Sequence, residues 1–167
     1  MTGIFGDTLF RSLNSVANAT FSILALIILC GITHIFVSRE GCDSNVAVLL
    51  ALSTFVIFIP PDFTTPSGEQ IGNVMTKEWI GSNGMITAII VALFTSYVFC
   101  FCMKKRWVIS LPSSVPRNVT RAFDGIVPAA ILFTTAAIIS GLCNAYGATT
   151  FPALIFKLIQ IPLQGIS

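Results

Sequence analysis

The one histidine of this chain, His34, is the side chain best suited to proton chemistry. It lies in the stretch GITHIFVSRE, near the end of a long apolar run. An ionisable group inside an apolar segment can relay protons across a membrane, usually with a charged partner nearby. On the same run the nearest carboxylate is Glu40, nearly two helical turns further on. We therefore favour a packing histidine at the membrane interface, with a proton relay as the alternative.

The cysteines show no pattern of a metal site or a disulfide framework. None of them forms a Cys-x-x-Cys pair, and no histidine stands at metal-ligand spacing from any of them. Four lie in apolar runs or at their ends, where a thiol behaves as a small apolar side chain. We expect no metal, no cofactor and no disulfide. The five are Cys30, Cys42, Cys100, Cys102 and Cys143.

Other catalytic arrangements are equally weak. A single histidine in an apolar run supports no Ser–His–Asp set, and the sequence has no G-x-x-x-x-G-K-[ST] phosphate loop. We expect no catalytic residue in this chain. A membrane enzyme is therefore the weakest functional alternative.

The composition indicates an integral membrane protein. Hydrophobic residues make up 54% of the 167 residues and charged residues only 10%, with a mean hydropathy of +0.89. A soluble domain has about a quarter of its residues charged, and this chain has too few to coat a soluble core. The net charge of +2 says little about partners. The start of the chain lacks the basic region and cleavage site of a signal peptide.

Four apolar segments are long enough, or nearly so, to cross a bilayer as helices. A spanning helix needs about 20 mostly apolar residues, with about 17 as a lower bound. The second segment is shorter, but its small and hydroxyl residues suit a helix that packs closely on neighbours. The expected spans are residues 16–37, 46–59, 84–102 and 125–143.

A fifth apolar stretch, residues 151–163, differs from these four. Its sequence, FPALIFKLIQIPL, is short and places Lys157 and Gln160 among apolar residues. That pattern is typical of a helix lying at the membrane surface. The sequence therefore predicts an all-α, polytopic membrane protein with about four transmembrane helices and a C-terminal interfacial amphipathic helix. Residues 1–167 form a single membrane domain in this interpretation.

The distribution of lysine and arginine predicts the orientation. The polar loop 60–83 contains one basic residue, Lys77, whereas five follow the third span. Since basic residues are enriched in cytoplasmic loops, residues 103–121 should be cytoplasmic and both the loop 60–83 and the amino terminus outside. An outside amino terminus without a signal peptide fits a chain that lacks a first span. The five basic residues are Lys104, Lys105, Arg106, Arg117 and Arg121.

Residues 107–123, WVISLPSSVPRNVTRAF, connect the third and fourth spans. Pro112 and Pro116 fix φ and favour extended geometry in the residues before them. We therefore expect an extended cytoplasmic connector, with Ser, Asn and Thr available to begin the next helix.

This connector resembles a motif of one membrane-protein family. LPSSVPRNVTRAFDGIVPAAI is similar to the loop of the lactose/cellobiose family of phosphotransferase-system (PTS) permeases, the enzyme IIC components. WIGSNGMITAIIVALF resembles the segment that leads into the family's preceding helix, and FKLIQIPLQG its amphipathic segment. The matching connector positions are Leu111, Pro112, Ser114, Val115, Pro116, Val119, Arg121, Phe123 and Pro128.

The resemblance implies a function that this chain carries only in part. Permeases of the family are more than twice this length, and the match lies in their amino-terminal half, after the first helix. That half mainly builds the scaffold and the homodimer contact, and the other half carries most of the sugar-binding residues. We therefore expect a truncated part of a β-disaccharide permease of the bacterial cytoplasmic membrane. Its partners would be the lipid bilayer, the cytoplasmic enzyme IIB and IIA proteins and the sugar.

Two residues depart from the family's motif, and one alternative function stays open. Arg117 replaces a proline, and Asp124 replaces a small residue. We expect Asp124 to pair with Arg121, three positions earlier, with a role in transport as the alternative. The basic residues directly after the third span favour lipid headgroups over nucleic acid as a partner. The alternative is a small stand-alone four-span protein that acts by interaction or assembly in the membrane.

Overall fold

The computed structural model describes residues 2–59, 62–64, 70–72, 77–107, 123–147, 150–155 and 158. These residues are almost entirely helical, which confirms the all-α expectation. A two-stranded antiparallel hairpin, β1 (Asp62–Thr64) with β2 (Gln70–Gly72), lies in the segment expected as a loop. The helices are α1 (Thr2–Ser22), α2 (Leu24–Arg39), α3 (Ser44–Phe58), α4 (Lys77–Ile80), α5 (Met85–Lys104) and α7 (Ile126–Gly147), with a short 3₁₀ helix, η1 (Ser82–Gly84).

Helix lengths decide which elements are able to cross a membrane. Within the described residues, two helices are long and apolar enough, over Ser82–Lys104 and Ile126–Cys143. The bent pair Leu9–Ser22 and Leu24–Arg39 makes a third if it is counted as one span. The segment expected as the second span forms α3, whose 15 residues measure about 22 Å, less than the roughly 30 Å of a bilayer core.

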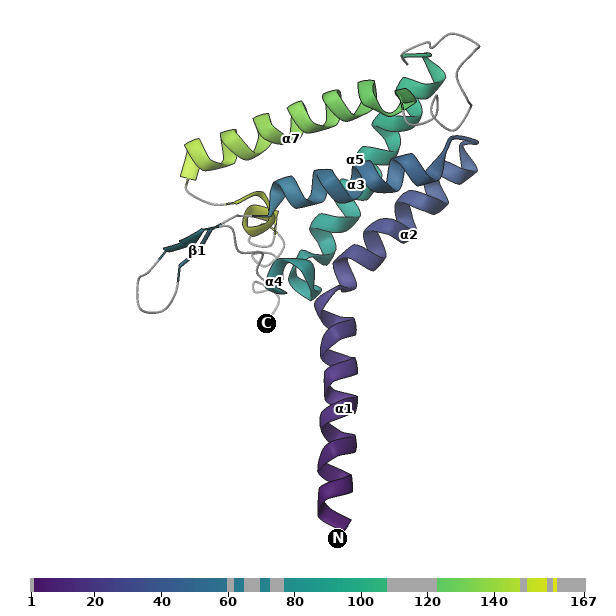
Figure 1. The fold of residues 1–167 in the computed structure, drawn as a ribbon. Helices are drawn as coiled ribbons and strands as arrows, with labels where there is room; N and C mark the ends of the chain where they lie inside the picture. Colours follow the sequence, from purple (N-terminus) through teal and green to yellow (C-terminus); the bar gives the residue numbers. More distant parts are fainter. Residues whose placement is uncertain are drawn as a thin grey trace.

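The segment expected as one helix over residues 16–37 is bent. Its two parts belong to α1 and α2, which meet at an angle of 49° beside Ile23. The N–H of Ile23 bonds the carbonyl of Thr20 at 3.3 Å, three positions earlier, so the regular ladder is interrupted there. The Thr20 hydroxyl also donates to the carbonyl of Val16, a side-chain bond that promotes helix bending. As a result, α1 extends away from the other helices (Figure 1).

The remaining helices form a bundle with alternating directions. α2 and α5 run the same way, and α3 and α7 run the opposite way (Figure 1). α2 packs on α5 and α3, and α3 also packs on α5 and α7. Alanines fill the contacts and let the backbones approach closely, as is usual in membrane bundles. The fully buried ones are Ala25, Ala47, Ala51, Ala88 and Ala92.

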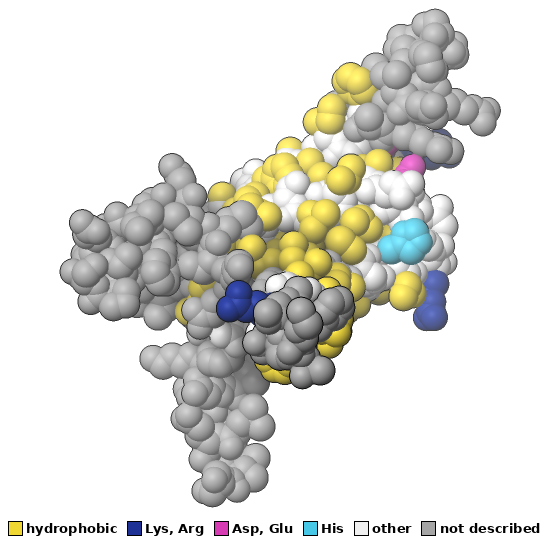
Figure 2. All heavy atoms as spheres, turned by 60° about the horizontal axis from the view of Figure 1, so that its bottom comes forward, with side chains coloured by type: hydrophobic (Ala, Val, Ile, Leu, Met, Phe, Trp, Pro, Cys, Tyr) yellow, Lys and Arg dark blue, Asp and Glu magenta, His cyan; other side chains and the backbone are white. Residues whose placement is uncertain are grey.

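The hydrophobic core is small, and the outer surface is apolar. Leu29, Phe55 and Val91 are buried among the alanines in the main cluster. On the face of the molecule shown in Figure 2, hydrophobic side chains are spread over the described residues, with few charged ones among them. Side chains such as Leu49 and Tyr97 are each 65% exposed. Apolar side chains on the outside suit helices surrounded by lipid.

The expected amphipathic segment 151–163 is described only at its start. Residues 151–155 and 158 are helical, with Pro152 and Ile155 buried. The ring of Phe151 lies 4.4 Å from that of Phe58 on α3, centroid to centroid. The rest of the segment, including Lys157 and Gln160, lies outside the described residues. Its position at a membrane surface therefore stays a prediction.

Candidate functional site

Seven of the charged residues that the structure describes gather at one end of the bundle, which we call the basic end: Arg39, Glu40, Asp43, Lys104, Lys105, Arg106 and Asp124. It consists of residues 39–45 between α2 and α3, residues 103–107 at the end of α5, and residues 123–124 before α7. These segments approach one another because α2 and α5 both end there while α3 and α7 both begin there (Figure 1).

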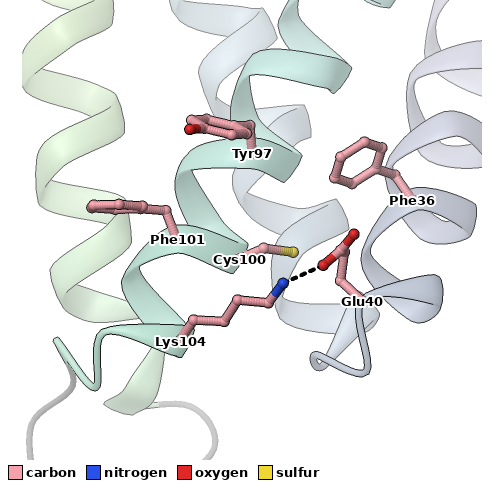
Figure 3. Close-up of a pocket in the computed structure, with 6 residues that line it drawn as sticks. All are labelled: Phe36, Glu40, Tyr97, Cys100, Phe101 and Lys104. Carbon is pink, nitrogen blue, oxygen red and sulfur yellow. Dashed lines mark hydrogen bonds and ion pairs between the residues drawn. The ribbon is translucent and has the colours of Figure 1, made fainter.

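An ion pair joins two helices at the basic end. Lys104 Nζ, on the last turn of α5, contacts Glu40 Oε2, at the C-cap of α2 (Figure 3). The two side chains are 60% and 38% exposed. An exposed pair of this kind contributes little to stability, because water and salt screen the two charges. Its main consequence is that one basic and one acidic side chain are held together at the mouth of a groove.

That groove runs between α2 and α5 and has a volume of about 290 Å³. Aromatic rings line it above the ion pair, as Figure 3 shows. Tyr97 and Phe101 are stacked 6.5 Å apart, and Trp107 meets Phe101 edge-on at 5.9 Å. Lys105 Nζ lies 5.9 Å from the centre of the Phe101 ring. The lining residues are Phe36, Glu40, Tyr97, Cys100, Phe101 and Lys104.

A second depression lies around the turn between α2 and α3, with a volume of about 500 Å³. The Asp43 carboxylate accepts a 3.1 Å bond from the N–H of Asn45 and so caps α3. Gly41 adopts φ 72°, which lets the chain turn sharply out of α2. Asp124 and Met103 complete the depression. The lining of this depression therefore comes from all three segments that form the basic end.

Most of the connector motif lies outside the described residues. Leu111, Pro112, Ser114, Val115, Pro116, Val119 and Arg121 fall within residues 108–122, so their role stays a prediction. The expected ion pair between Asp124 and Arg121 also stays a prediction, because Arg121 lies outside the described residues.

Two motif residues are described. The Phe123 side chain is 38% exposed, and Pro128 is buried within the first turn of α7. A proline is tolerated in a first turn because the N–H that it lacks would have no helical partner there.

His34 lies on the surface of α2. It lines an open depression of about 540 Å³ together with Cys30 and Asn45. Glu40, the carboxylate considered as its partner, binds Lys104 instead. The sequence does not indicate that Glu40 pairs with Lys104, because the two residues are 64 positions apart. Only the matching positions of Glu40 and Lys104 at the ends of two apolar runs could have indicated it.

The cysteines and the other potential metal ligands of the described segments are spread over several helices and turns. All five cysteines are free thiols. Across the parts of the chain that the structure describes, no three His, Cys, Asp or Glu side chains come close enough to hold a metal ion. The arrangement is that of a packed helical scaffold with a charged end and an aromatic groove.

Comparison with known proteins extends this description. The family described as "Phosphotransferase system, EIIC" matches residues 2–165, nearly the whole chain. The chain belongs to the phosphotransferase system EIIC family. The resemblance seen in the three sequence blocks is thereby confirmed.

Several EIIC proteins are similar over most of this chain. The oligo-beta-mannoside-specific EIIC component of Bacillus subtilis (strain 168) is 25% identical over 160 residues, which cover 95% of this chain and 36% of that protein. The cellobiose-specific EIIC component of Geobacillus stearothermophilus is 25% identical over 165 residues, 96% of this chain and 37% of that protein.

A solved structure of the family has the same fold. It is the crystal structure of the transporter ChbC, the IIC component from the N,N'-diacetylchitobiose-specific phosphotransferase system. The two superpose with a TM-score of 0.81 and 28% identity, over 87% of this chain and 35% of ChbC. This EIIC chain thus spans about a third of the length of these relatives.

Proposed function

We propose that this chain forms part of a sugar permease that takes up a β-linked disaccharide and couples uptake to phosphorylation. The observation that carries the proposal is the match to ChbC over 87% of the chain at a TM-score of 0.81. The substrate class comes from the names of the relatives, which specify oligo-beta-mannosides, cellobiose and N,N'-diacetylchitobiose. All of these are β-linked saccharides.

The chain crosses the bacterial cytoplasmic membrane several times in this proposal, with the basic end in the cytoplasm. α5 and α7 are apolar over a membrane's thickness. Arg39, Lys104, Lys105 and Arg106 stand at one end of the bundle, and the enrichment of basic residues in cytoplasmic segments supports this orientation. α3 is too short to cross the bilayer alone, but it packs against α2 and α5, which shield its ends from lipid in this proposal.

We further propose that the chain supplies the scaffold of the permease, and that the sugar site lies mainly in the segments of the relatives that this chain does not match. The groove between α2 and α5 and the depression beside His34 are lined mainly by apolar side chains, which bind sugar hydroxyls poorly. The depression around the turn between α2 and α3 is more polar, with Asp43, Asn45 and Asp124, and it lies at the basic end. The connector 107–123 joins α5 to α7 on the cytoplasmic side. The enzyme IIB and IIA proteins and a second copy of the permease are the expected partners.

The alternative is a stand-alone interaction or assembly protein of the membrane. The self-contained bundle favours it, because the described helices bury a core of their own. The family match favours the permease. Genes for enzyme IIA and IIB proteins beside this one, or an adjacent reading frame for the rest of a permease, would support the permease.

Sugar uptake tests the proposal directly. Cells that lack their own β-disaccharide permease would express this chain alone, or together with the remaining segments of an EIIC permease. We expect phosphorylation-coupled uptake of cellobiose only in the second case. Uptake by this chain alone would contradict the proposal that the sugar site lies mainly in segments that this chain does not match. No uptake in either case, with both parts present in the membrane, would favour the interaction protein.

A further inference from the structure

The groove between α2 and α5 combines an apolar wall with a charged mouth. Tyr97 is 65% exposed and Phe101 42% exposed, and Phe36 is half-buried on the facing helix. Phe101 and Tyr97 lie about one and two turns before the end of α5, and Phe36 lies about one turn before the end of α2. A spanning helix is still surrounded by hydrocarbon at this depth. The groove therefore offers acyl chains an aromatic surface at the edge of the bilayer.

The mouth of the groove is strongly basic. Lys104, Lys105 and Arg106 are consecutive and exposed, and Arg39 stands at the end of α2. Among the described residues, Glu40 is the one carboxylate that lines the groove, and it forms an ion pair with Lys104. Lys104 lines the groove and Lys105 stands over the Phe101 ring, so two basic side chains lie beside this carboxylate. Asp43 and Asp124 line the separate depression around the turn between α2 and α3.

The backbone holds these basic residues at a defined depth. Arg106 adopts φ 55°, and the N–H of Trp107 bonds the carbonyl of Cys102 at 2.9 Å, which closes the end of α5. Trp107 is 52% exposed and packs edge-on against Phe101. Exposed tryptophans of membrane proteins lie at the level of the lipid headgroups. The basic mouth is thus placed at the headgroup level.

We propose that this groove binds one anionic phospholipid. Lys104 and Lys105 bind its phosphate, and one acyl chain lies along Phe36, Tyr97 and Phe101. Glu40 competes with the lipid phosphate for Lys104 and so limits the affinity. Basic pockets between membrane helices on the cytoplasmic side are suited to anionic headgroups. The proposal rests on the membrane embedding proposed above and is independent of sugar uptake.

Lipid retention by the purified chain tests the proposal. The full chain would be delipidated in a mild detergent, supplied with phosphatidylglycerol or with phosphatidylcholine of the same acyl chains, and examined by native mass spectrometry. We expect one phosphatidylglycerol per chain, held at least about tenfold more tightly than phosphatidylcholine, and no binding of inorganic phosphate. Equal retention of the two lipids would overturn the proposal. Binding of inorganic phosphate with the same preference would identify a site for soluble anions and would also overturn it.

Single substitutions distinguish lipid binding in the groove from attraction by the net charge of the chain. Lys105→Gln should weaken phosphatidylglycerol binding about fivefold, the effect of one basic residue near the surface. The matched control is Arg11→Gln on α1, which removes the same charge away from the groove and should change nothing. Equal losses in the two variants would mean attraction by net charge alone and would contradict a specific site.

Two further variants test the other parts of the groove. Glu40→Gln should tighten binding, because it frees Lys104; a gain of affinity cannot result from unfolding. Tyr97→Ala should weaken binding of phosphatidylglycerol without changing the charge. Weaker binding in Glu40→Gln, or unchanged binding in Tyr97→Ala, would contradict the proposed contacts.

Discussion

The carbonyl oxygen of Trp79 lies where a side chain on Gly84 would have to stand: a Cβ added to Gly84 would be 1.7 Å from that oxygen. The Phe55 ring lies 3.5 Å from the same point. The turn WIGSNG therefore folds back tightly under the bundle, with Gly84 buried and Trp79 packed against the main core. A glycine is required there by close approach of the backbone.

Substitution of this glycine should destabilise the fold. Gly84→Ala places the new Cβ against the carbonyl of Trp79 and forces the two backbone segments apart, so we expect a loss of about 1–3 kcal/mol in the free energy of unfolding. Thermal unfolding in detergent, followed by helical circular dichroism, measures the effect. The matched control is Gly31→Ala on α2, where nothing lies within 4 Å of the added Cβ. A Gly84→Ala variant as stable as the control would contradict the close approach.

The ion pair between Glu40 and Lys104 should contribute little to stability. Both side chains are well exposed, so a double-mutant cycle with Glu40→Gln and Lys104→Gln should give a coupling energy no larger than that of an ordinary surface ion pair. Added salt should reduce that coupling further. A large coupling energy that does not fall with added salt would contradict the exposed position of the pair.

Two buried threonines should be replaceable at no cost. Thr33 and Thr95 are fully buried, and among the described residues their hydroxyl oxygens have no hydrogen-bond partner. A buried hydroxyl without a partner is unfavourable, so Thr33→Val and Thr95→Val should leave the unfolding temperature unchanged or raise it.

The control for these variants is a buried threonine that does form a bond. The Thr54 hydroxyl donates to the carbonyl of Leu50 at 2.7 Å. Thr54→Val should therefore lower stability by about 0.5–1 kcal/mol under the same conditions. Losses of similar size in all three variants would show that Thr33 and Thr95 also form bonds.

Chemical accessibility should reveal the orientation of the bundle. In a variant without native cysteines, Ser113→Cys in the connector should resist an impermeant thiol reagent added to intact bacteria. Ser67→Cys in the loop between α3 and α4 should react. The reason is that basic residues follow α5 and only Lys77 lies in the other loop. The reverse pattern of labelling would place the basic end outside the cell and would contradict the proposed topology.

Much of the architecture was already determined by the sequence. α5 and α7 overlap the segments predicted at 84–102 and 125–143, because apolar length is a local property that needs no partner to be recognised. Three motif blocks were enough to indicate the family, which the match over residues 2–165 confirms. The sequence does not predict the bend at Ile23, because the bend comes from a local change in backbone hydrogen bonding that hydropathy does not reveal.

Only the tertiary structure decided how the helices meet. Residues as far apart as Glu40 and Lys104 come together because α2 and α5 run in parallel and end at the same level. That register depends on which alanines face each other across the bundle and on the tight turn at Gly84. Charge counts and apolar lengths are read along one segment at a time. The fit between two surfaces exists only once both helices are in place, and the aromatic groove with its basic mouth is a product of that fit.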